Sequence, residues 1–211
     1  MTRSPICVKR TNGRSRSVES CTAFNRCIPT PTTPVRKALE GRLCRLRPYR
    51  AQDARAICAV ADDFMVARWM TRAFPYPYTL RDAESWISLA TSDGPGRYYA
   101  IEVDGIVAGG IGVEPYRGER IGAAAFGYWL GQAYWGRGIG TDAARTLSDD
   151  ALTDGSLRRL EARVFAPNVA SARVLEKCDF QLEATLRAFY VDRNDKVRDA
   201  LMFARLAKDN R

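Results

Sequence analysis

Apolar and polar residues alternate along most of the chain in patterns typical of short strands and amphipathic helices. The segment LCRLRPY at 43–49 alternates over a few residues, which predicts a strand that Pro48 ends. Apolar residues spaced three and four apart then predict a helical region over 54–70. The prolines of FPYPY at 74–78 interrupt that region. The first third of the periodic part is therefore expected to be mainly helical.

A helix start is predicted at Thr79, because Asp82 follows three residues later and such a pair can cap the first turn. The helix is expected to run over 80–89, and the residues 92–96 form a turn cluster. Its predicted buried face consists of Ala83, Trp86 and Ile87.

From residue 97 the period changes to that of strands. The runs 97–103 and 106–114 flank Asp104-Gly105, and a pair of this kind between two β-rich runs is the strongest short-range signal for a hairpin. A third strand is predicted over 121–130. Further along come a helix over 141–152, a strand over 157–165, a helix capped by Asn168 and running to 177, and an antiparallel pair over 180–191 and 197–206.

This order of elements predicts an α/β fold. Three antiparallel strands followed by one βαβ unit imply a mixed, mostly antiparallel central sheet of six to seven strands with helices on both faces. The length of 211 residues fits one domain with an appendage.

The appendage is expected at the N-terminus. Residues 1–40 show no period and carry eight basic residues against two acidic ones, so they hold a net charge of +6 and leave +3 of the total +9 for the rest. We interpret 1–40 as a disordered basic arm and 41–211 as one folded domain. A targeting segment and an over-extended gene start fit the same composition and remain open.

Composition excludes several kinds of chemistry. The chain has no histidine, which removes Ser-His-Asp and Cys-His nucleophile activation and histidine-liganded zinc. Its six cysteines form no C-x-x-C pair, so neither a metal site nor a disulfide framework is indicated. No segment has the ~20 apolar residues that span a bilayer. A cytoplasmic protein with no membrane contact is expected.

Three glycines at Gly136, Gly138 and Gly140 lie between the strand over 121–130 and the helix over 141–152. Glycine permits close backbone approach, and the free N–H groups of a helix N-terminus attract an anion such as a pyrophosphate. A P-loop would need a lysine before Thr141, and a Rossmann fingerprint would open a parallel sheet. A glycine-rich turn without a ligand is the alternative.

At this loop the chain resembles the GNAT superfamily of N-acetyltransferases, in particular the RimJ/RimL-like branch that acetylates ribosomal-protein N-termini. The segment WGRGIG matches the family's Arg/Gln-x-x-G-x-G/A loop, with Trp135 at its first position. The segment NVASARVLEKCDF at 168–180 is similar to a second family block, with Asp179 where the family has glycine. FPYPYT and DAESWI are similar to the N-terminal half of this branch. The resemblance covers 43–206.

The resemblance implies an acetyl-CoA-dependent N-acetyltransferase that uses no metal. The pyrophosphate of the cosubstrate would bind the backbone of the loop, and its pantetheine arm would pair with a strand edge opened by a bulge near Gly127. The implied cofactor-binding residues are Tyr128, Trp129, Leu130, Arg137, Gly138, Ile139, Gly140, Thr141 and Asn168.

Acetyl transfer to an amine needs a proton acceptor and stabilisation of the departing thiolate. Glu114 is the candidate base, directly or through water. Many relatives carry an acid on the next strand, at the place of Ala125. Ser171 is the candidate hydroxyl near the cofactor sulfur. A solvated strand-end charge and a helix-surface serine are the alternatives.

The acceptor itself is not determined by the sequence. Tyr76 and Tyr78 are candidates for the wall of an amine site, with gap-filling between helix and sheet as the alternative. The acceptor is expected to be a protein N-terminus or a small-molecule amine, and the chain to be a monomer or homodimer. Two further hypotheses are a non-catalytic acyl-CoA-binding module and, from the net charge alone, a nucleic-acid-binding protein.

Overall fold

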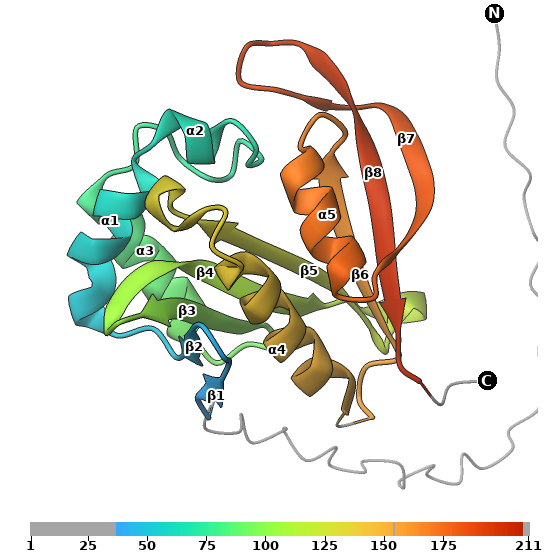
Figure 1. Cartoon of the computed structure of the whole chain (residues 1–211), viewed down its shortest axis with the longest axis horizontal. Coiled ribbons are helices and arrows are strands. Elements are labelled where there is room, and N and C mark those ends of the chain that lie inside the picture. The colour runs from blue at the N-terminus through green and yellow to red at the C-terminus, as the bar shows by residue number, and fades with distance from the viewer. Residues whose placement is uncertain (1–36, 154, 209–211) are drawn as a thin grey trace, which may run out of the picture. The chain divides into compact units, whose positions relative to one another are not determined.

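The computed structural model describes residues 37–153 and 155–208, which form one eight-stranded sheet with helices on both faces (Figure 1). The strand order is β1-β2-β3-β4-β5-β6-β8-β7, and β5–β6 is the parallel pair among otherwise antiparallel neighbours. The strands are β1 Leu39–Glu40, β2 Arg45–Arg47, β3 Arg97–Val103, β4 Ile106–Pro115, β5 Ala123–Leu130, β6 Arg159–Phe165, β7 Gln181–Val191 and β8 Val197–Leu206.

The mixed, mostly antiparallel sheet is confirmed, and its strand count is higher than predicted. The additional strand is β1, whose Leu39 lies opposite Leu46 of β2. Leu39 and Glu40 fall in the segment interpreted as a disordered arm. A two-residue strand is too short to show a period, so the sequence pattern does not reveal it. The rest of that arm, residues 1–36, lies outside the described residues.

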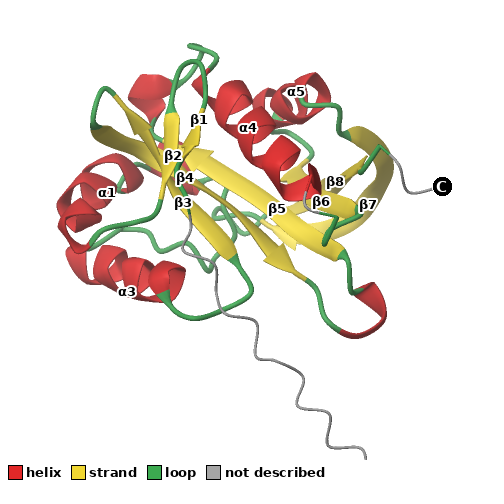
Figure 2. Cartoon of the chain, turned by 90° about the horizontal axis from the view of Figure 1, so that it is seen from below, coloured by secondary structure: helices red, strands yellow, loops and turns green. Residues whose placement is uncertain are grey.

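Two layers of helices enclose the sheet (Figure 2). α1 (Ala54–Ala61) and α3 (Leu80–Thr91) cover one face, and α4 (Ile139–Thr153) and α5 (Val169–Lys177) cover the other. Each layer buries its own apolar cluster against the sheet. No helix in the described part of the chain is long and apolar enough to cross a membrane.

Local capping explains where the predicted helices begin. Thr79 and Asp82 form the expected capping box at the start of α3. The helical region over 54–70 is divided, because Asp63 adopts an extended backbone and its carboxylate accepts the Met65 N–H at 2.7 Å. This cap starts the short helix α2 (Phe64–Ala67).

β5 and β6 separate soon after they begin. They pair only from Ala123–Arg159 to Ala125–Glu161, whereas β5 stays paired with β4 as far as Leu130. The β4–β5 register is continuous, so the bulge expected near Gly127 is absent from this ladder. The sheet opens because β6 turns to follow β8, with which it pairs along its whole length.

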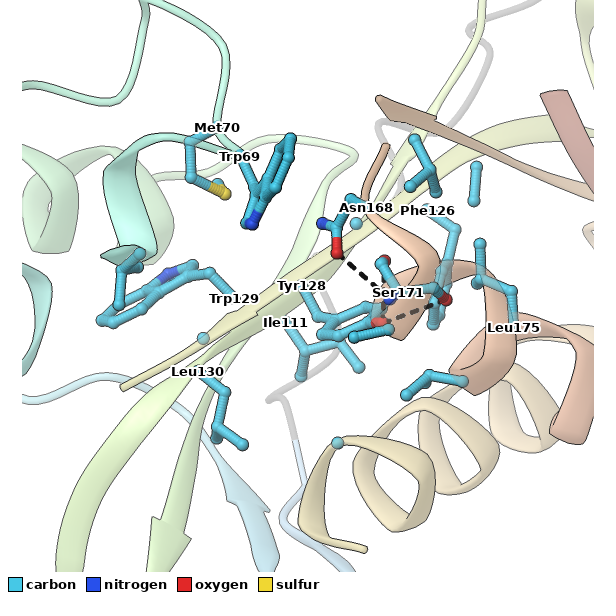
Figure 3. Close-up of a pocket in the computed structure, with 18 of the residues that line it drawn as sticks. Trp69, Met70, Ile111, Phe126, Tyr128, Trp129, Leu130, Asn168, Ser171 and Leu175 are labelled. Atoms are coloured by element: carbon cyan, nitrogen blue, oxygen red, sulfur yellow. Dashed lines mark hydrogen bonds between the residues drawn. The ribbon is translucent and has the colours of Figure 1, made fainter. Parts of the chain in front are cut away.

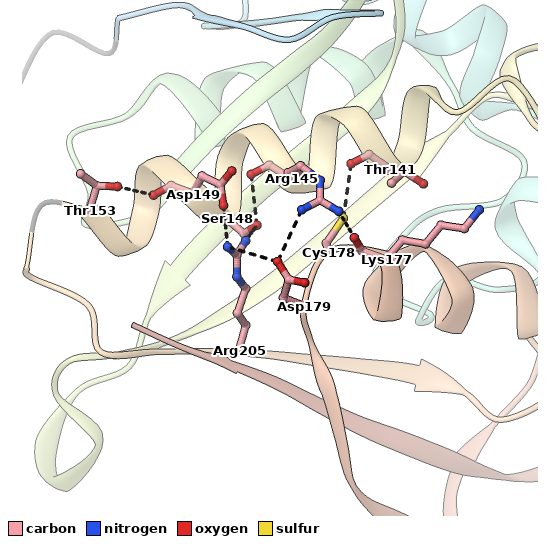
Figure 4. Close-up of polar contacts among 9 residues, drawn as sticks. All are labelled: Thr141, Arg145, Ser148, Asp149, Thr153, Lys177, Cys178, Asp179 and Arg205. Atoms are coloured by element: carbon pink, nitrogen blue, oxygen red, sulfur yellow. Dashed lines mark hydrogen bonds and ion pairs between the residues drawn. The ribbon is translucent and has the colours of Figure 1, made fainter. Parts of the chain in front are cut away.

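The C-terminal end of α5 shows how Asp179 replaces the family's glycine. Asp179 has φ +64, and the Phe180 N–H donates to the Leu175 carbonyl at 3.1 Å while the Asp179 N–H donates to Glu176 at 3.2 Å. This is a Schellman motif, whose left-handed residue is usually glycine. The exposed Asp179 carboxylate lies near Arg145 and Arg205, which also contacts Ser148 and Asp149 of α4 (Figure 4).

We predict that Asp179→Gly is more stable than Asp179→Ala by about 1 kcal/mol, because glycine adopts the left-handed conformation without steric cost. Both variants remove the same exposed carboxylate, so their difference isolates the backbone effect. Urea unfolding of the two variants measures it. Equal stability would contradict this explanation of the helix end.

Candidate functional site

A cleft of about 710 Å³ opens where β5 and β6 separate. Residues of β4, β5, β6, α4, α5 and the segment 66–71 line it, so it reaches both faces of the sheet. Most of the predicted site residues meet there: Glu114, Tyr128, Trp129, Leu130, Gly138, Ile139, Gly140, Thr141, Asn168 and Ser171.

The glycine loop and the start of α4 form one wall of the cleft. Gly136 and Gly138 have φ values of +70 and +79, which glycine adopts without strain. The first intrahelical hydrogen bond runs from the Asp142 N–H to the Gly138 carbonyl at 3.0 Å. The N–H groups of 139–141 therefore have no acceptor within the helix and suit an anion.

The β1–β2 turn supports this loop. The N–H groups of Arg42, Leu43 and Cys44 donate to the Asp142 carboxylate at 3.1, 2.8 and 3.2 Å. Asp142 is in the first turn of α4, where its charge would oppose a bound anion. Because the β1–β2 turn takes up that carboxylate, the N–H groups nearer the loop remain available.

Beyond Ala125 the edge of β5 no longer pairs with β6, so its backbone N–H and C=O groups are available for hydrogen bonds. The Ala123 carbonyl and the Gly131 N–H both bond to the β4 side of the sheet. Because direction alternates along a strand, the N–H and C=O groups of Phe126, Tyr128 and Leu130 point to the opposite side, into the cleft. The Leu130 carbonyl already accepts the Trp135 indole N–H at 2.7 Å.

Tyr128 and Ser171 bring two hydroxyls together inside the cleft (Figure 3). The Tyr128 Oη atom lies 2.9 Å from Ser171 Oγ. Asn168 caps α5, and its Oδ1 accepts the Ser171 N–H at 3.3 Å. Burial raises the pKa of Tyr128 to about 12, so this phenol stays protonated at neutral pH.

The part of the cleft on the α1–α3 face has an aromatic and carboxylate lining. Tyr98 donates its hydroxyl hydrogen bond to the Glu114 carboxylate. The ring of Tyr98 packs edge-on against Trp86 at a centroid distance of 5.3 Å. Gly110, Gly112 and Gly127 lie on the same face of the sheet. A Cβ at Gly110 would clash with the Tyr49 hydroxyl, and one at Gly112 would clash with the Tyr98 ring. Aromatic side chains therefore pack directly on these two glycines, whereas Gly127 faces open space. The glycines at alternate positions of GGIG were the sequence signal for this close packing.

Glu114 lies well away from the hydroxyl pair. It is opposite Ala125 in the β4–β5 register, three residues along β5 from Tyr128. At about 3.3 Å per residue, this corresponds to roughly 10 Å between backbone positions. A proton from a group held near Ser171 would therefore reach Glu114 through water.

Three predicted site residues do not line the cleft. Tyr78 is buried against Phe74, and exposed Tyr76 packs against Phe64. The exposed Arg137 side chain lies over the Tyr134 ring. Four aromatic side chains that do line the cleft come from segments distant in sequence: Trp69, Trp86, Tyr98 and Trp129.

Cysteine and metal chemistry have little support in the described residues. Cys178 is buried, donates its thiol to the Thr141 carbonyl, and has its pKa raised to about 11 by burial. No group of three or more potential metal ligands lies together in residues 37–153 and 155–208.

Comparison with known proteins shows a consistent set of relatives. The family model described as an acetyltransferase (GNAT) domain matches residues 43–181. The chain is 30% identical over 171 residues, 78% of this chain and 93% of the relative, to a Bacillus licheniformis protein named uncharacterized N-acetyltransferase p20.

Two solved structures share the fold. RimJ of Mycobacterium smegmatis, in complex with CoA-disulfide, has a TM-score of 0.72 and 26% identity, covering 82% of this chain and 87% of that one. The microcin C7 self-immunity acetyltransferase MccE, in complex with acetyl-CoA and AMP, has a TM-score of 0.69 and 20% identity, covering 78% and 93%.

We predict a loss of stability at high pH, because burial raises the pKa of Tyr78 and of Tyr128 to about 12, above the ~10 of an unfolded chain. The neutral phenols stabilise the fold fully below pH ~10, and this contribution is lost as the pH rises towards 12. Tyrosinate absorbance and circular dichroism during a base titration should change together. Phe variants of Tyr78 and Tyr128 should reduce the loss. Ionisation of all nine tyrosines near pH 10 with the fold intact would contradict this.

Proposed function

Because this chain belongs to the GNAT family of acetyltransferases, we propose that it transfers the acetyl group of acetyl-CoA to a primary amine. The acceptor is a protein N-terminal α-amine or a small-molecule amine, which attacks directly in a ternary complex. The observation that carries this proposal is the joining of an anion-binding helix start and an open strand edge in one cleft.

The described residues fit acetyl-CoA, which is a substrate of the reaction and supplies the activated acetyl group. The N–H groups of 137–141 suit its pyrophosphate. The backbone of Tyr128 suits the pantetheine amides, which would add to the sheet like a further strand. The space above Gly127 supports this, since a Cβ there would meet nothing within 4 Å. Leu130 contributes its N–H, because Trp135 already bonds to its carbonyl. Asn168 would position Ser171 as well as cap α5.

Direct attack is favoured over an acetyl-enzyme intermediate. Such an intermediate needs an activated nucleophile, and the buried Cys178 thiol is held protonated by its raised pKa of about 11. Ser171 is hydrogen-bonded to a phenol rather than to a general base. The amine is therefore the nucleophile.

The amine must be neutral to attack. An α-amine titrates near ~8 and a lysine near ~10, so an α-amine loses its proton more readily at neutral pH. Glu114 is the carboxylate that would take this proton, through water because of its distance from the hydroxyl pair. The rings of Trp86 and Tyr98 give the amine an aromatic wall beside that carboxylate.

A second candidate function is a non-catalytic acyl-CoA-binding module. The observation that favours it is Ala125, which lies opposite Glu114 where many relatives carry an acid. The two functions differ in turnover. Release of free thiol from acetyl-CoA in the presence of an amine panel supports the enzyme, and tight CoA binding without turnover supports the module.

We predict that Gly140→Asp weakens CoA binding on the order of 100-fold or more without destabilising the protein. Gly140 is in the first turn of α4, where an acidic residue favours the helix but repels a pyrophosphate. A Cβ at this position makes ordinary contacts, the nearest at 3.8 Å from Tyr128. Calorimetry measures binding, and Gly140→Ala is the matched control. If both variants bind CoA like the parent, the pyrophosphate is not at this loop.

We predict that Glu114→Gln lowers the acetylation rate by about 100-fold, within the range for loss of a general base, with little effect on acetyl-CoA affinity. Initial rates across pH measure the effect. Glu119→Gln on the exposed β4–β5 connection is the control. An unchanged rate for Glu114→Gln would remove this residue from the mechanism.

A further inference from the structure

The Tyr128 hydroxyl performs a task that packing does not require. Its ring packs against the apolar cluster between the sheet, α4 and α5, and phenylalanine would fill that space equally well. The hydroxyl is directed instead at Ser171 on α5 (Figure 3). Within the described residues its polar contacts are Ser171 Oγ at 2.9 Å and the Ser171 carbonyl oxygen at 3.5 Å.

The two distances show which Ser171 atom is hydrogen-bonded to the Tyr128 hydroxyl. A distance of 3.5 Å is too long for an ordinary O–H···O hydrogen bond, whereas 2.9 Å is within the usual range. Either hydroxyl could donate across the 2.9 Å contact. A phenol O–H is more acidic than an aliphatic hydroxyl and is therefore the stronger donor, so we assign the donor role to Tyr128 and the acceptor role to Ser171 Oγ. Because Ser171 Oγ then accepts a hydrogen bond, its own proton is free to point into the cleft.

Ser171 is held by two contacts, one at its backbone N–H and one at its side-chain oxygen. Asn168 holds the Ser171 N–H at the first turn of α5, and Tyr128 holds its Oγ from β5. Both Ser171 and Tyr128 line the cleft beside the edge of β5 that we assign to the pantetheine arm. The arm ends in the thioester sulfur, so a donor at this place faces the leaving group.

We propose that Tyr128 is a positioning residue that orients the Ser171 hydroxyl as a hydrogen-bond donor to the departing thiolate. This rests on the proposed acetyl transfer. In that step the amine nitrogen bonds to the acetyl carbon, the carbon–sulfur bond breaks, and its electron pair stays on sulfur. The amine proton leaves through water towards Glu114. The Ser171 O–H stabilises the charge on sulfur, strengthened by the hydrogen bond that Ser171 accepts.

No proton needs to pass from Tyr128 to sulfur. An alkyl thiol titrates near ~8.5, while burial raises the pKa of Tyr128 to about 12. Proton transfer from the phenol to the thiolate would be unfavourable, because the pKa of the phenol lies about three or more above that of the thiol. The phenol therefore keeps its proton. The thiolate takes up a solvent proton after release.

The test is the acidity of the CoA thiol when bound to the enzyme. We expect the bound thiol to titrate about one pH unit below its ordinary ~8.5, because a hydrogen bond to the charged form favours that form. Thiolate absorbance, with a desulfo-CoA complex as the blank, measures it. Tyr128→Phe and Ser171→Ala should return the pKa towards its ordinary value. Tyr49→Phe, which removes another buried hydroxyl outside the cleft, should leave it low.

Single-turnover acetylation adds a second readout. We expect Tyr128→Phe to slow it about 10-fold and Ser171→Ala on the order of 100-fold, the loss typical of a donor to a developing charge. Adding Tyr128→Phe to Ser171→Ala should cost nothing further, because the two residues act as a unit. Desulfo-CoA affinity should be equal in all variants.

Two results would overturn the proposal. One is a bound-thiol pKa that is the same in the parent and in Tyr128→Phe. The other is an equal loss of CoA and desulfo-CoA affinity in Tyr128→Phe, which would show a packing role. If the parent protein binds no CoA at all, the proposed function fails instead, so the two failures are distinguishable.

Discussion

β5 and β6 begin side by side and separate after three residue pairs, and the cleft depends on this separation. β5 remains in register with β4, while β6 pairs along its whole length with β8. β5 therefore continues alongside β4, whereas β6 continues alongside β8. Backbone groups of β5 that would bond to a strand in a continuous sheet face the cleft instead, where unpaired N–H and C=O groups need a partner.

The same separation connects two regions that a closed sheet would keep apart. On one face lie the start of α4 and the hydroxyl pair of Tyr128 and Ser171. On the other face lie Glu114 and its aromatic neighbours, which pack directly on glycines of β4. A donor bound on the first face and an amine bound on the second could meet only through this gap. In the proposed reaction, backbone N–H groups, hydroxyls and one carboxylate would supply the chemistry of a chain that has no histidine.

Local patterns predicted the parts of the fold that local forces determine. The Asp104-Gly105 turn has both residues at positive φ, the Thr79–Asp82 cap forms, and Asn168 caps α5 as expected. The pattern did not predict contacts between distant segments. The Asp142 carboxylate is bound by a turn about 100 residues earlier, and β1 is too short to show a period. Tyr76 and Tyr78 line no part of the cleft, because Tyr78 is buried in the apolar cluster of α1 and α3 and Tyr76 packs against Phe64. Their place is taken by aromatic residues from α3, β3 and β5.

We propose that the separated edge of β5 receives the pantetheine arm of acetyl-CoA while the start of α4 receives the pyrophosphate. A crystal structure of the complex with acetyl-CoA tests it most directly. We expect pantetheine amides hydrogen-bonded to the backbone at Tyr128, pyrophosphate oxygens on the N–H groups of 137–141, and the sulfur beside Ser171 Oγ. Acetyl-CoA bound elsewhere, with β5 and β6 still apart and the cleft empty, would contradict it.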